Sequence, residues 1–370
     1  MFRSVAKDFV RNFVKPSVKR IEINKKMDTN YIKTIFDNGY MGIEVPEKYG
    51  GLGASFRDSI DIIKEISKID PTTSLLIDIQ NTLIHPIMKK YASDYQREMY
   101  WHKLATTDIG CFALSEINSG SDAFSIKTKA VYNNDNTWTI NGSKMWISNS
   151  DHGNYFFVFA QTDQKYGSYN GIKCFIVHRN NYGIEIGDPE SKLGLKGSGT
   201  CPLYFDNCIV SNNNLIPYPG YKIAIETLNI GRIAIGAQMI GIAVGAMDIT
   251  WPILQERKQF GLPIYEFQSV RHNFSKMRAE ILALESLLDR CVYLYEKNEN
   301  YLIEASSLKY LSGKLAQSIT SECIDLVGGI GFTEDLLLAK LYRDSKIGSI
   351  YEGTNNIQLE TIGKQEYICI

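Results

Sequence analysis

Glu352 is the acid with the most suggestive surroundings in this chain, because it lies in the segment Ile350-Tyr351-Glu352-Gly353-Thr354. A carboxylate that is buried beside an apolar ligand has a raised pKa and can act as a general base. An acid followed by Gly-Thr means little by itself, however. Its interpretation depends on whether other segments of the chain could bind a ligand beside it.

Two segments near the middle of the chain could bind a flat ring that carries a diphosphate. Residues 112–122 offer hydroxyls, backbone N–H groups and a glycine, and residues 141–149 include Trp146 and Ser148. An indole can stack on a ring system, and a hydroxyl can form a hydrogen bond with it. Taken alone, the first segment is typical of a polar surface loop, and a buried core is the commoner environment of a tryptophan.

Two later segments could contact a diphosphate. Arg257 and Gln268 lie on either side of a turn that contains glycine and proline, and Gly328 and Gly329 follow a predicted helix. The planar guanidinium of arginine can donate paired hydrogen bonds to a diphosphate, and glycine lets the backbone approach a ligand closely. The simpler interpretation is that each segment ends a helix. For Arg257, both interpretations can hold.

In this order, the segments resemble the motifs of the acyl-CoA dehydrogenase family, flavoproteins that oxidise a thioester at its α and β carbons. The resemblance extends over nearly the whole chain and is closest to the short-chain members. It implies that Glu352 removes the α-proton and that FAD accepts the β-hydrogen as hydride. The residues that it assigns to FAD are Phe112, Leu114, Ser115, Gly120, Ser121, Trp146, Ile147, Ser148, Arg257, Gln268, Gly328, Gly329, Gly353, Thr354 and Asn355.

The resemblance also identifies residues for the substrate. These are Ser121, Asn229, Arg232 and Gly353. One branch of the family carries its base immediately before the arginine that matches Arg232, but this chain has Gly231 there. Glu352 is therefore the only candidate base of the two. Residues 117–119 and Asn229 depart from the usual family pattern, so the resemblance leaves substrate details open. Asp325 stands where the family often has glutamine, which leaves open whether it contacts FAD.

The function implied by the resemblance is FAD-dependent conversion of an acyl-CoA to a trans-2-enoyl-CoA, with an electron-transferring flavoprotein as acceptor. In the family, the residues that match Arg257, Gln268, Gly328 and Gly329 reach the FAD of a neighbouring subunit, which implies a homo-oligomer built as a dimer of dimers. One alternative keeps the chemistry and changes the carrier: a dehydrogenase or oxidase of an acyl or aminoacyl group held on a carrier protein in secondary metabolism. Another alternative, a non-catalytic flavin-binding scaffold, is disfavoured because Glu352 lies in an intact motif.

The pattern of apolar residues predicts a mainly α protein with a central β domain. We expect an N-terminal helical domain at residues 1–109, a small β-sandwich or barrel-like domain at 110–215, and a C-terminal four-helix bundle at 216–370. Long helices are predicted at residues 232–254, 268–297 and 303–326. In the N-terminal domain, a first helix is expected to end before Pro16, and residues 45–53 are expected to form a turn between helices.

The β domain is predicted from short apolar runs at residues 155–161, 172–178 and 203–210. Asn141-Gly142 is a typical hairpin turn signal, and residues 133–136 and 163–170 are expected to be polar turns.

Composition limits the partners and the compartment. The net charge of −1 favours neither nucleic acid nor an anionic membrane. The seven cysteines are scattered without CxxC spacing, which predicts reduced thiols and no metal site, so we expect a bacterial or archaeal cytoplasm or a mitochondrial matrix and not secretion. The apolar stretch at residues 233–247 is too short to span a bilayer. Residues 1–20 are basic and amphipathic, but a first core helix is favoured over a transit peptide.

Overall fold

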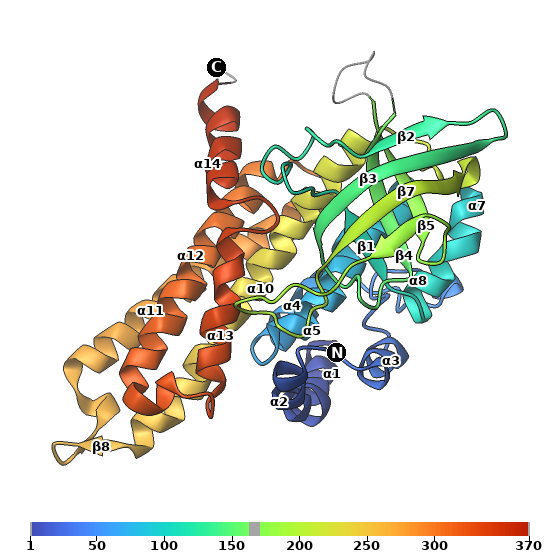
Figure 1. Cartoon of the computed structure of the whole chain (residues 1–370). Helices are drawn as coiled ribbons and strands as arrows, with labels where there is room; N and C mark the ends of the chain where they lie inside the picture. Colours follow the sequence, from blue (N-terminus) through green and yellow to red (C-terminus); the bar gives the residue numbers. More distant parts are fainter. Residues whose placement is uncertain (1, 163–170, 369–370) are drawn as a thin grey trace.

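The computed structural model describes residues 2–162 and 171–368. It has an N-terminal helical part, a curled β sheet and a C-terminal set of long helices, and α10 runs beside α4 at the centre of the molecule (Figure 1). The predicted order of helical, β and helical parts is confirmed. The boundaries at residues 109/110 and 215/216 stay predictions.

The N-terminal part is made of short helices, several of which begin at a side-chain cap. Asp28 caps α3 and Asp70 caps α5, while Ser55 and Asp58 form a capping box at the start of α4. The helices are α1 (Phe2–Phe9), α2 (Lys15–Asn24), α3 (Thr29–Asp37), α4 (Phe56–Ser67), α5 (Pro71–Asp78), α6 (His85–Lys90), α7 (Asp94–Gln96) and α8 (His102–Thr106), with π-helical turns at Val10–Val14, Ile79–Ile84 and Arg97–Trp101. The expected turn between helices at residues 45–53 is confirmed, because it joins α3 to α4.

The prediction that the first helix ends before Pro16 is wrong. A π-helical turn joins α1 to α2, and Pro16 lies in the first turn of α2. The lack of an N–H group is tolerated in the first turn of a helix, so the chain continues without a break. Phe9, Val10 and Val14 are buried, as expected of a core helix, whereas Val5 is exposed.

The β part is one curled sheet whose most buried strand is β4. In the described residues the strands are β1 (Gly110–Ala113), β2 (Lys129–Tyr132), β3 (Thr137–Ile147), β4 (Tyr155–Gln161), β5 (Ile172–His178), β6 (Ile184–Ile186) and β7 (Cys201–Ser211). Their order is β1-β4-β2-β3-β7-β6, with β5 paired to the other side of β4. β1 is parallel to β4, and the long β3 and β7 are antiparallel. This sheet holds two of the predicted cofactor segments at the ends of β1 and β3.

The prediction of a hairpin turn at Asn141-Gly142 is wrong, because both residues lie inside β3. The register of β3 against β7 shifts between Ile140 and Gly142, so the turn signal marks a bulge. Gly142 has φ 141°, and a Cβ there would lie 2.6 Å from Cα of Thr128. The β2–β3 turn falls at residues 133–136, as predicted, whereas the predicted turn at 163–170 lies outside the described residues.

The C-terminal part is built around α10. Its helices are α10 (Gly220–Glu256), α11 (Gln268–Glu296), α12 (Leu302–Val327), α13 (Leu337–Ser345) and α14 (Asn355–Gly363), with the short strands β8 (Lys258–Gln259) and β9 (Leu262–Pro263) between α10 and α11. A Cβ on Gly241 or Gly245 would come within 2.3 Å or 2.0 Å of a carbonyl oxygen of α4, so α10 requires small residues there. The two helices can therefore pack closely.

α10 is also long and apolar enough to cross a membrane, although the apolar stretch within it was predicted to be too short. In the protein, 83% of its most apolar window is buried against other elements, which is how a core helix packs. The six described cysteines are buried and free, and no group of three or more metal-ligating side chains occurs in the described residues. The free cysteines agree with the prediction of reduced thiols.

Candidate active site

Glu352 lies between α13 and α14 and is partly buried. Burial raises the pKa of Glu352 to about 7, and the nearby cations Arg232 and Lys309 oppose that rise. Its Oε2 atom is buried and has no hydrogen-bond partner within the described residues. A buried carboxylate that is half deprotonated near neutral pH and has a free oxygen is suited to accept a proton from a ligand.

The backbone at Glu352 is held in an unusual conformation. Glu352 has φ 53° and Gly353 has φ 87°, the left-handed region that non-glycine residues rarely adopt. Nε2 of Gln358 donates to the carbonyls of both residues at 3.0 and 2.9 Å, and Nζ of Lys309 donates to the Gly353 carbonyl at 2.6 Å. Sequence reasoning missed Lys309 and Gln358. A lysine within an apolar helical run was the available signal.

The predicted substrate residues Arg232 and Asn229 are close to the base. Nη1 of Arg232 donates to Oδ1 of Asn229 at 3.0 Å and to Oγ of Ser306 at 3.2 Å, and burial lowers the pKa of the guanidinium. Nε of Arg232 is buried without a partner in the described part of the chain. A buried, partly unpaired guanidinium can hold a ligand that brings an acceptor.

A second buried acid that sequence reasoning missed, Asp78, lies close enough to Glu352 to interact with it electrostatically. It accepts a hydrogen bond from Oγ1 of Thr82 at 2.6 Å, and burial raises its pKa well above the usual range. The hydroxyl of Tyr351 donates to Oε1 of Gln238, and burial likewise raises the pKa of Tyr351. Burial thus disfavours the ionised forms of Asp78 and Tyr351, whereas Glu352, with a pKa of about 7, titrates near neutrality.

The first two predicted cofactor segments are joined by a buried ion pair. Nζ of Lys144 donates to the Leu114 carbonyl at 2.9 Å and to Oε1 of Glu116 at 2.8 Å, and the amide of Met145 donates to the Ser115 carbonyl at 2.9 Å. The end of β1 and the strand β3 therefore form one unit. Leu114 and Ser115 lie beside the strand that carries Trp146.

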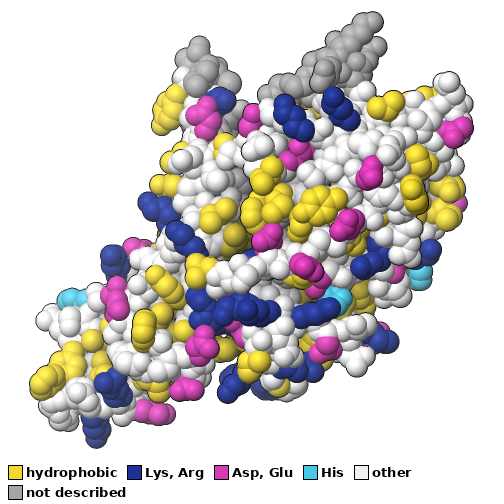
Figure 2. All heavy atoms as spheres, viewed as in Figure 1, with side chains coloured by type: hydrophobic (Ala, Val, Ile, Leu, Met, Phe, Trp, Pro, Cys, Tyr) yellow, Lys and Arg dark blue, Asp and Glu magenta, His cyan; other side chains and the backbone are white. Residues whose placement is uncertain are grey.

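Trp146 has φ 64°, and its side chain is 55% exposed. A large indole held out of the core on a left-handed backbone fits a role in covering a flat ligand ring. Ser148 follows the end of β3 and is partly buried, and Gly120 and Ser121 are exposed on the loop after β1. On the face of the molecule in Figure 2, hydrophobic side chains gather between the C-terminal helices and the sheet.

The remaining residues of these segments have mainly structural contacts. Phe112 packs its ring 4.9 Å from that of Phe159, and Ile147 is buried in the core. Thr354 caps α14 by accepting from the amide of Ile357. Oδ1 of Asn355 is buried and has no partner in the described residues, so it could accept from a ligand.

The third and fourth predicted segments meet each other but lie away from Glu352. Nη1 of Arg257 donates to the Val327 carbonyl, and a Cβ on Gly328 would lie 3.2 Å from the same nitrogen. Gln268 and Gly329 are exposed nearby, at the start of α11 and the end of α12. The strand β8, which directly follows Arg257, is at the opposite end of the helical part from α14 (Figure 1). One chain thus contains two separate groups of predicted cofactor residues.

The segment that leads to Glu352 is anchored by Arg343 and Asp344. Asp344 accepts from the Leu195 amide at 2.6 Å and pairs with Lys340, while Arg343 pairs with Glu22 at 3.1 Å. The two residues therefore bind different partners and connect α13 to the N-terminal helices and to the β part.

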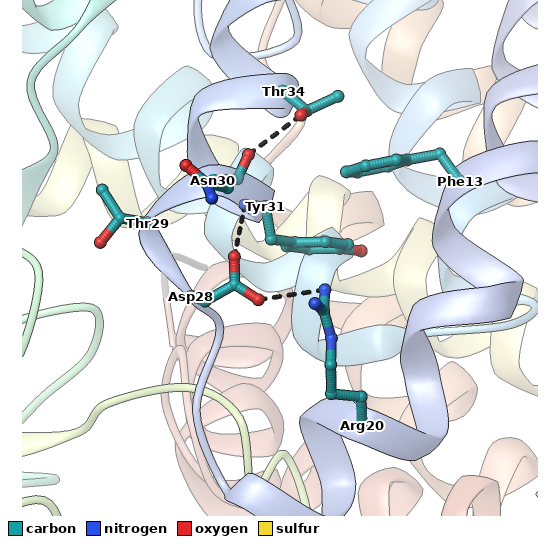
Figure 3. Close-up of a pocket in the computed structure, with 7 residues that line it drawn as sticks. All are labelled: Phe13, Arg20, Asp28, Thr29, Asn30, Tyr31 and Thr34. Carbon is teal, nitrogen blue, oxygen red and sulfur yellow. Dashed lines mark hydrogen bonds and ion pairs between the residues drawn. The ribbon is translucent and has the colours of Figure 1, made fainter.

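A surface hollow between α2 and α3 is explained by structural contacts and not by a ligand. It is lined by Phe13, Arg20, Asp28, Thr29, Asn30, Tyr31 and Thr34 (Figure 3). Asp28 accepts from the Tyr31 amide at 2.8 Å and pairs with Arg20 at 3.0 Å, and the Tyr31 ring stacks on Phe13. These contacts cap α3 and hold it against the first helices, so they account for the polar groups without a ligand.

Comparison with known proteins agrees with this arrangement. Models of the N-terminal, middle and C-terminal domains of acyl-CoA dehydrogenases match residues 1–108, 111–208 and 219–367. The short/branched chain specific acyl-CoA dehydrogenase of rat mitochondria is 43% identical over 98% of this chain and 84% of its own length.

Two solved structures have the same fold. Butyryl-CoA dehydrogenase from Megasphaera elsdenii is 31% identical with a TM-score of 0.95, over 98% of this chain and 96% of that one. A chain in the structure described as the electron transferring flavoprotein of Acidaminococcus fermentans is 32% identical with a TM-score of 0.96, over 99% and 97%. The chain belongs to the acyl-CoA dehydrogenase family and is an FAD-dependent oxidoreductase that acts on the CH–CH bond of an acyl-CoA.

Proposed function

We propose that this chain dehydrogenates a short or branched acyl-CoA and that Glu352 is the base that removes the α-proton. The observation that carries this proposal is the buried Oε2 of Glu352, which has no partner in the described residues, on a carboxyl whose pKa is about 7. Such a group is largely deprotonated in slightly alkaline solution yet basic enough to accept a proton from carbon.

The reaction balances with one base. Glu352 forms a bond to the α-proton, and the electron pair of the broken α C–H bond becomes the second bond between the α and β carbons. The β-hydrogen would leave as hydride, for which bound FAD would supply the acceptor, and the product would be a trans-2-enoyl thioester. Arg232 and Lys309 keep positive charge near the carboxylate, which favours its ionised form before the reaction.

The residues around the ends of β1 and β3 suit the flavin ring. We propose that Leu114, Ser115 and Ser121 line it and that Trp146 and Ser148 cover and hydrogen-bond it. The half-exposed indole of Trp146 supports this role, as does the pairing of Lys144 with Glu116, which fixes the two segments against each other. Gly353, Thr354 and Asn355 would complete the site next to the base, where Oδ1 of Asn355 is unpartnered in the described residues.

We propose further that Arg257, Gln268, Gly328 and Gly329 contact the FAD of a second copy, within a dimer of dimers. The separation of these residues from Glu352 within one chain supports a role across subunits (Figure 1). Arg257 already lies against Gly328, and an arginine beside a glycine backbone suits a diphosphate.

The acyl group and the electron acceptor follow from the relatives. The rat relative is named for short and branched chains, which supports an acyl group of that size. The Acidaminococcus structure concerns an electron transferring flavoprotein, which supports a protein of that type as acceptor. Relatives from mitochondria and from bacteria support a matrix or cytoplasmic location. No contact in the described residues favours a carrier protein over coenzyme A as the thioester partner.

The test is the Glu352→Gln variant, mixed anaerobically with short and branched acyl-CoAs while the flavin absorbance is followed. The variant should retain FAD and perturb the flavin spectrum on binding thioester, but it should lose flavin bleaching. Glu360→Gln on α14, whose carboxylate is 60% exposed, is the control and should bleach like the parent. Bleaching of Glu352→Gln at the parental rate would overturn the assignment.

A further inference from the structure

Lys309 is a fully enclosed lysine in the middle of α12. Its side chain is 0% exposed, and Nζ donates to the Gly353 carbonyl at 2.6 Å. Within the described residues, no carboxylate oxygen lies within 4.0 Å of this nitrogen. Burial lowers the pKa of Lys309 to about 8, and the nearby Glu352 opposes that fall, so the lysine is still largely charged at neutral pH. A buried ammonium without a paired acid is costly, so its retention calls for a reason.

The backbone of Glu352 provides one reason. Its φ of 53° is strained for a residue with a side chain, and such strain persists only where the surroundings hold it in place. Lys309 and Gln358 are the side chains that do so, since together they donate to the carbonyls of Glu352 and Gly353. Lys309 comes from a different helix, α12, and therefore ties the turn to the core.

The charge of Lys309 provides a second reason. The charged or titratable groups that face Glu352 are Arg232 on α10, Lys309 on α12, Asp78 at the end of α5, and the adjacent Tyr351. Burial disfavours the ionised forms of the two acidic groups, whereas the two cations favour the ionised form of the Glu352 carboxylate. Arg232 is already hydrogen-bonded to Asn229 on α10 and to Ser306 on α12. Ser306 lies one turn before Lys309.

We propose that Lys309 is a positioning residue for the dehydrogenation: it fixes the strained turn that carries Glu352 and supplies a positive charge that keeps this base ionised. The inference rests on the proposed role of Glu352 and extends it to a residue that does not touch the reacting carbons. It separates two functions, because Gln358 also donates to the Gly353 carbonyl but carries no charge. The two side chains are thus matched for an experiment.

The test measures the rate constant of anaerobic flavin reduction as a function of pH in Lys309→Met, Lys309→Arg and Gln358→Leu. Loss of the cation raises the pKa of Glu352, so in Lys309→Met the rise of the rate with pH should move to higher pH, with a loss of about tenfold at neutral pH. Lys309→Arg should restore the position of that rise. Gln358→Leu should lower the rate without changing the pH at which the rate rises. FAD content and thioester affinity should stay near the parental values.

An unmoved pH profile and a parental rate in Lys309→Met would overturn the inference. If Lys309→Met does not fold, Lys309→Gln carries the same test, because it retains an N–H donor and removes the charge. The Glu352→Gln variant distinguishes a failure of the role proposed for Lys309 from a failure of the proposed function. If it is inactive while Lys309→Met behaves as the parent, only the role of Lys309 fails; if it reduces flavin normally, the proposed function fails as well.

Discussion

A Cβ atom on Gly231 would lie 2.7 Å from Oε2 of Glu352, so the two residues face each other across the candidate site. The resemblance implies that another branch of the family supplies its base from this position on α10, which here points at the carboxylate that we propose as the base. In this chain, the absence of a side chain at Gly231 leaves the space that the Glu352 carboxylate occupies. This geometry supports the proposal that the two positions are alternatives for one function.

Gly231→Ala should impair the reaction without loss of the fold. The added methyl group would approach Oε2 of Glu352 at 2.7 Å and Cδ2 of Leu83 at 3.2 Å, so the carboxylate has to move. Because a displacement of about 1 Å at a reacting group can cost on the order of 100-fold in rate, we expect flavin reduction to slow by at least about tenfold. Stopped-flow absorbance measures this rate. Gly363→Ala, where a Cβ meets nothing within 4 Å, is the control; equal rates in the two variants would contradict the expectation.

Glu352→Gln should stabilise the protein at alkaline pH. The carboxyl has a pKa of about 7 in the folded protein against a model value of 4.5, so folding favours its protonated form. That contribution is fully present below pH 4.5 and is lost as the pH rises through 7. The difference corresponds to on the order of 3 kcal/mol, which a neutral amide avoids. Chemical denaturation should show Glu352→Gln gaining stability over the parent at pH 8 but little at pH 4.5. A gain that is the same at both pH values would exclude this cause.

Much of the fold and part of the site could be predicted because the signals are local. The change from helical to strand periodicity near residue 110 and back near residue 216 follows the change in packing. Glu352, Trp146 and Arg257 belong to short motifs whose residue types match their chemistry. Asn141-Gly142 was wrongly predicted to be a hairpin turn, because the freedom in φ that suits a turn also suits a bulge. Which of the two forms depends on the pairing of β3 with β7.

The buried polar partners could not be predicted, because their contacts are distant in sequence. Lys309 binds a carbonyl 44 residues away, and in an apolar helix a lysine is ordinarily expected at the surface. Asp78, at the end of α5, is likewise buried and interacts electrostatically with Glu352, which is far away in sequence. Pro16 misled for a related reason: a π-helical turn before it lets the helix continue.

Lys144→Met should release FAD and destabilise the protein. Lys144 is fully buried and is the cation paired with Glu116, which also accepts from the amides of Lys127 and Thr128. Removal of one partner of a buried pair costs about 3 to 5 kcal/mol, because the other charge is left in the interior. The ratio of flavin to protein absorbance and urea unfolding measure the two effects. The double variant Lys144→Met/Glu116→Gln should recover part of the stability; a further loss in it would refute the ion-pair explanation.

Arg257→Met distinguishes a helix cap from a cofactor contact. Arg257 donates to the last carbonyl of α12, and loss of a cap alone should cost about 1 kcal/mol of stability and leave FAD bound. If the guanidinium also binds the diphosphate of FAD in a second subunit, the variant should release FAD on dilution, and added FAD should restore activity. Equilibrium dialysis of FAD and light scattering measure cofactor affinity and assembly. Arg271→Met is the control, because its guanidinium contacts the Glu266 carbonyl at the protein surface. Parental FAD affinity in Arg257→Met would show that this arginine only caps α12.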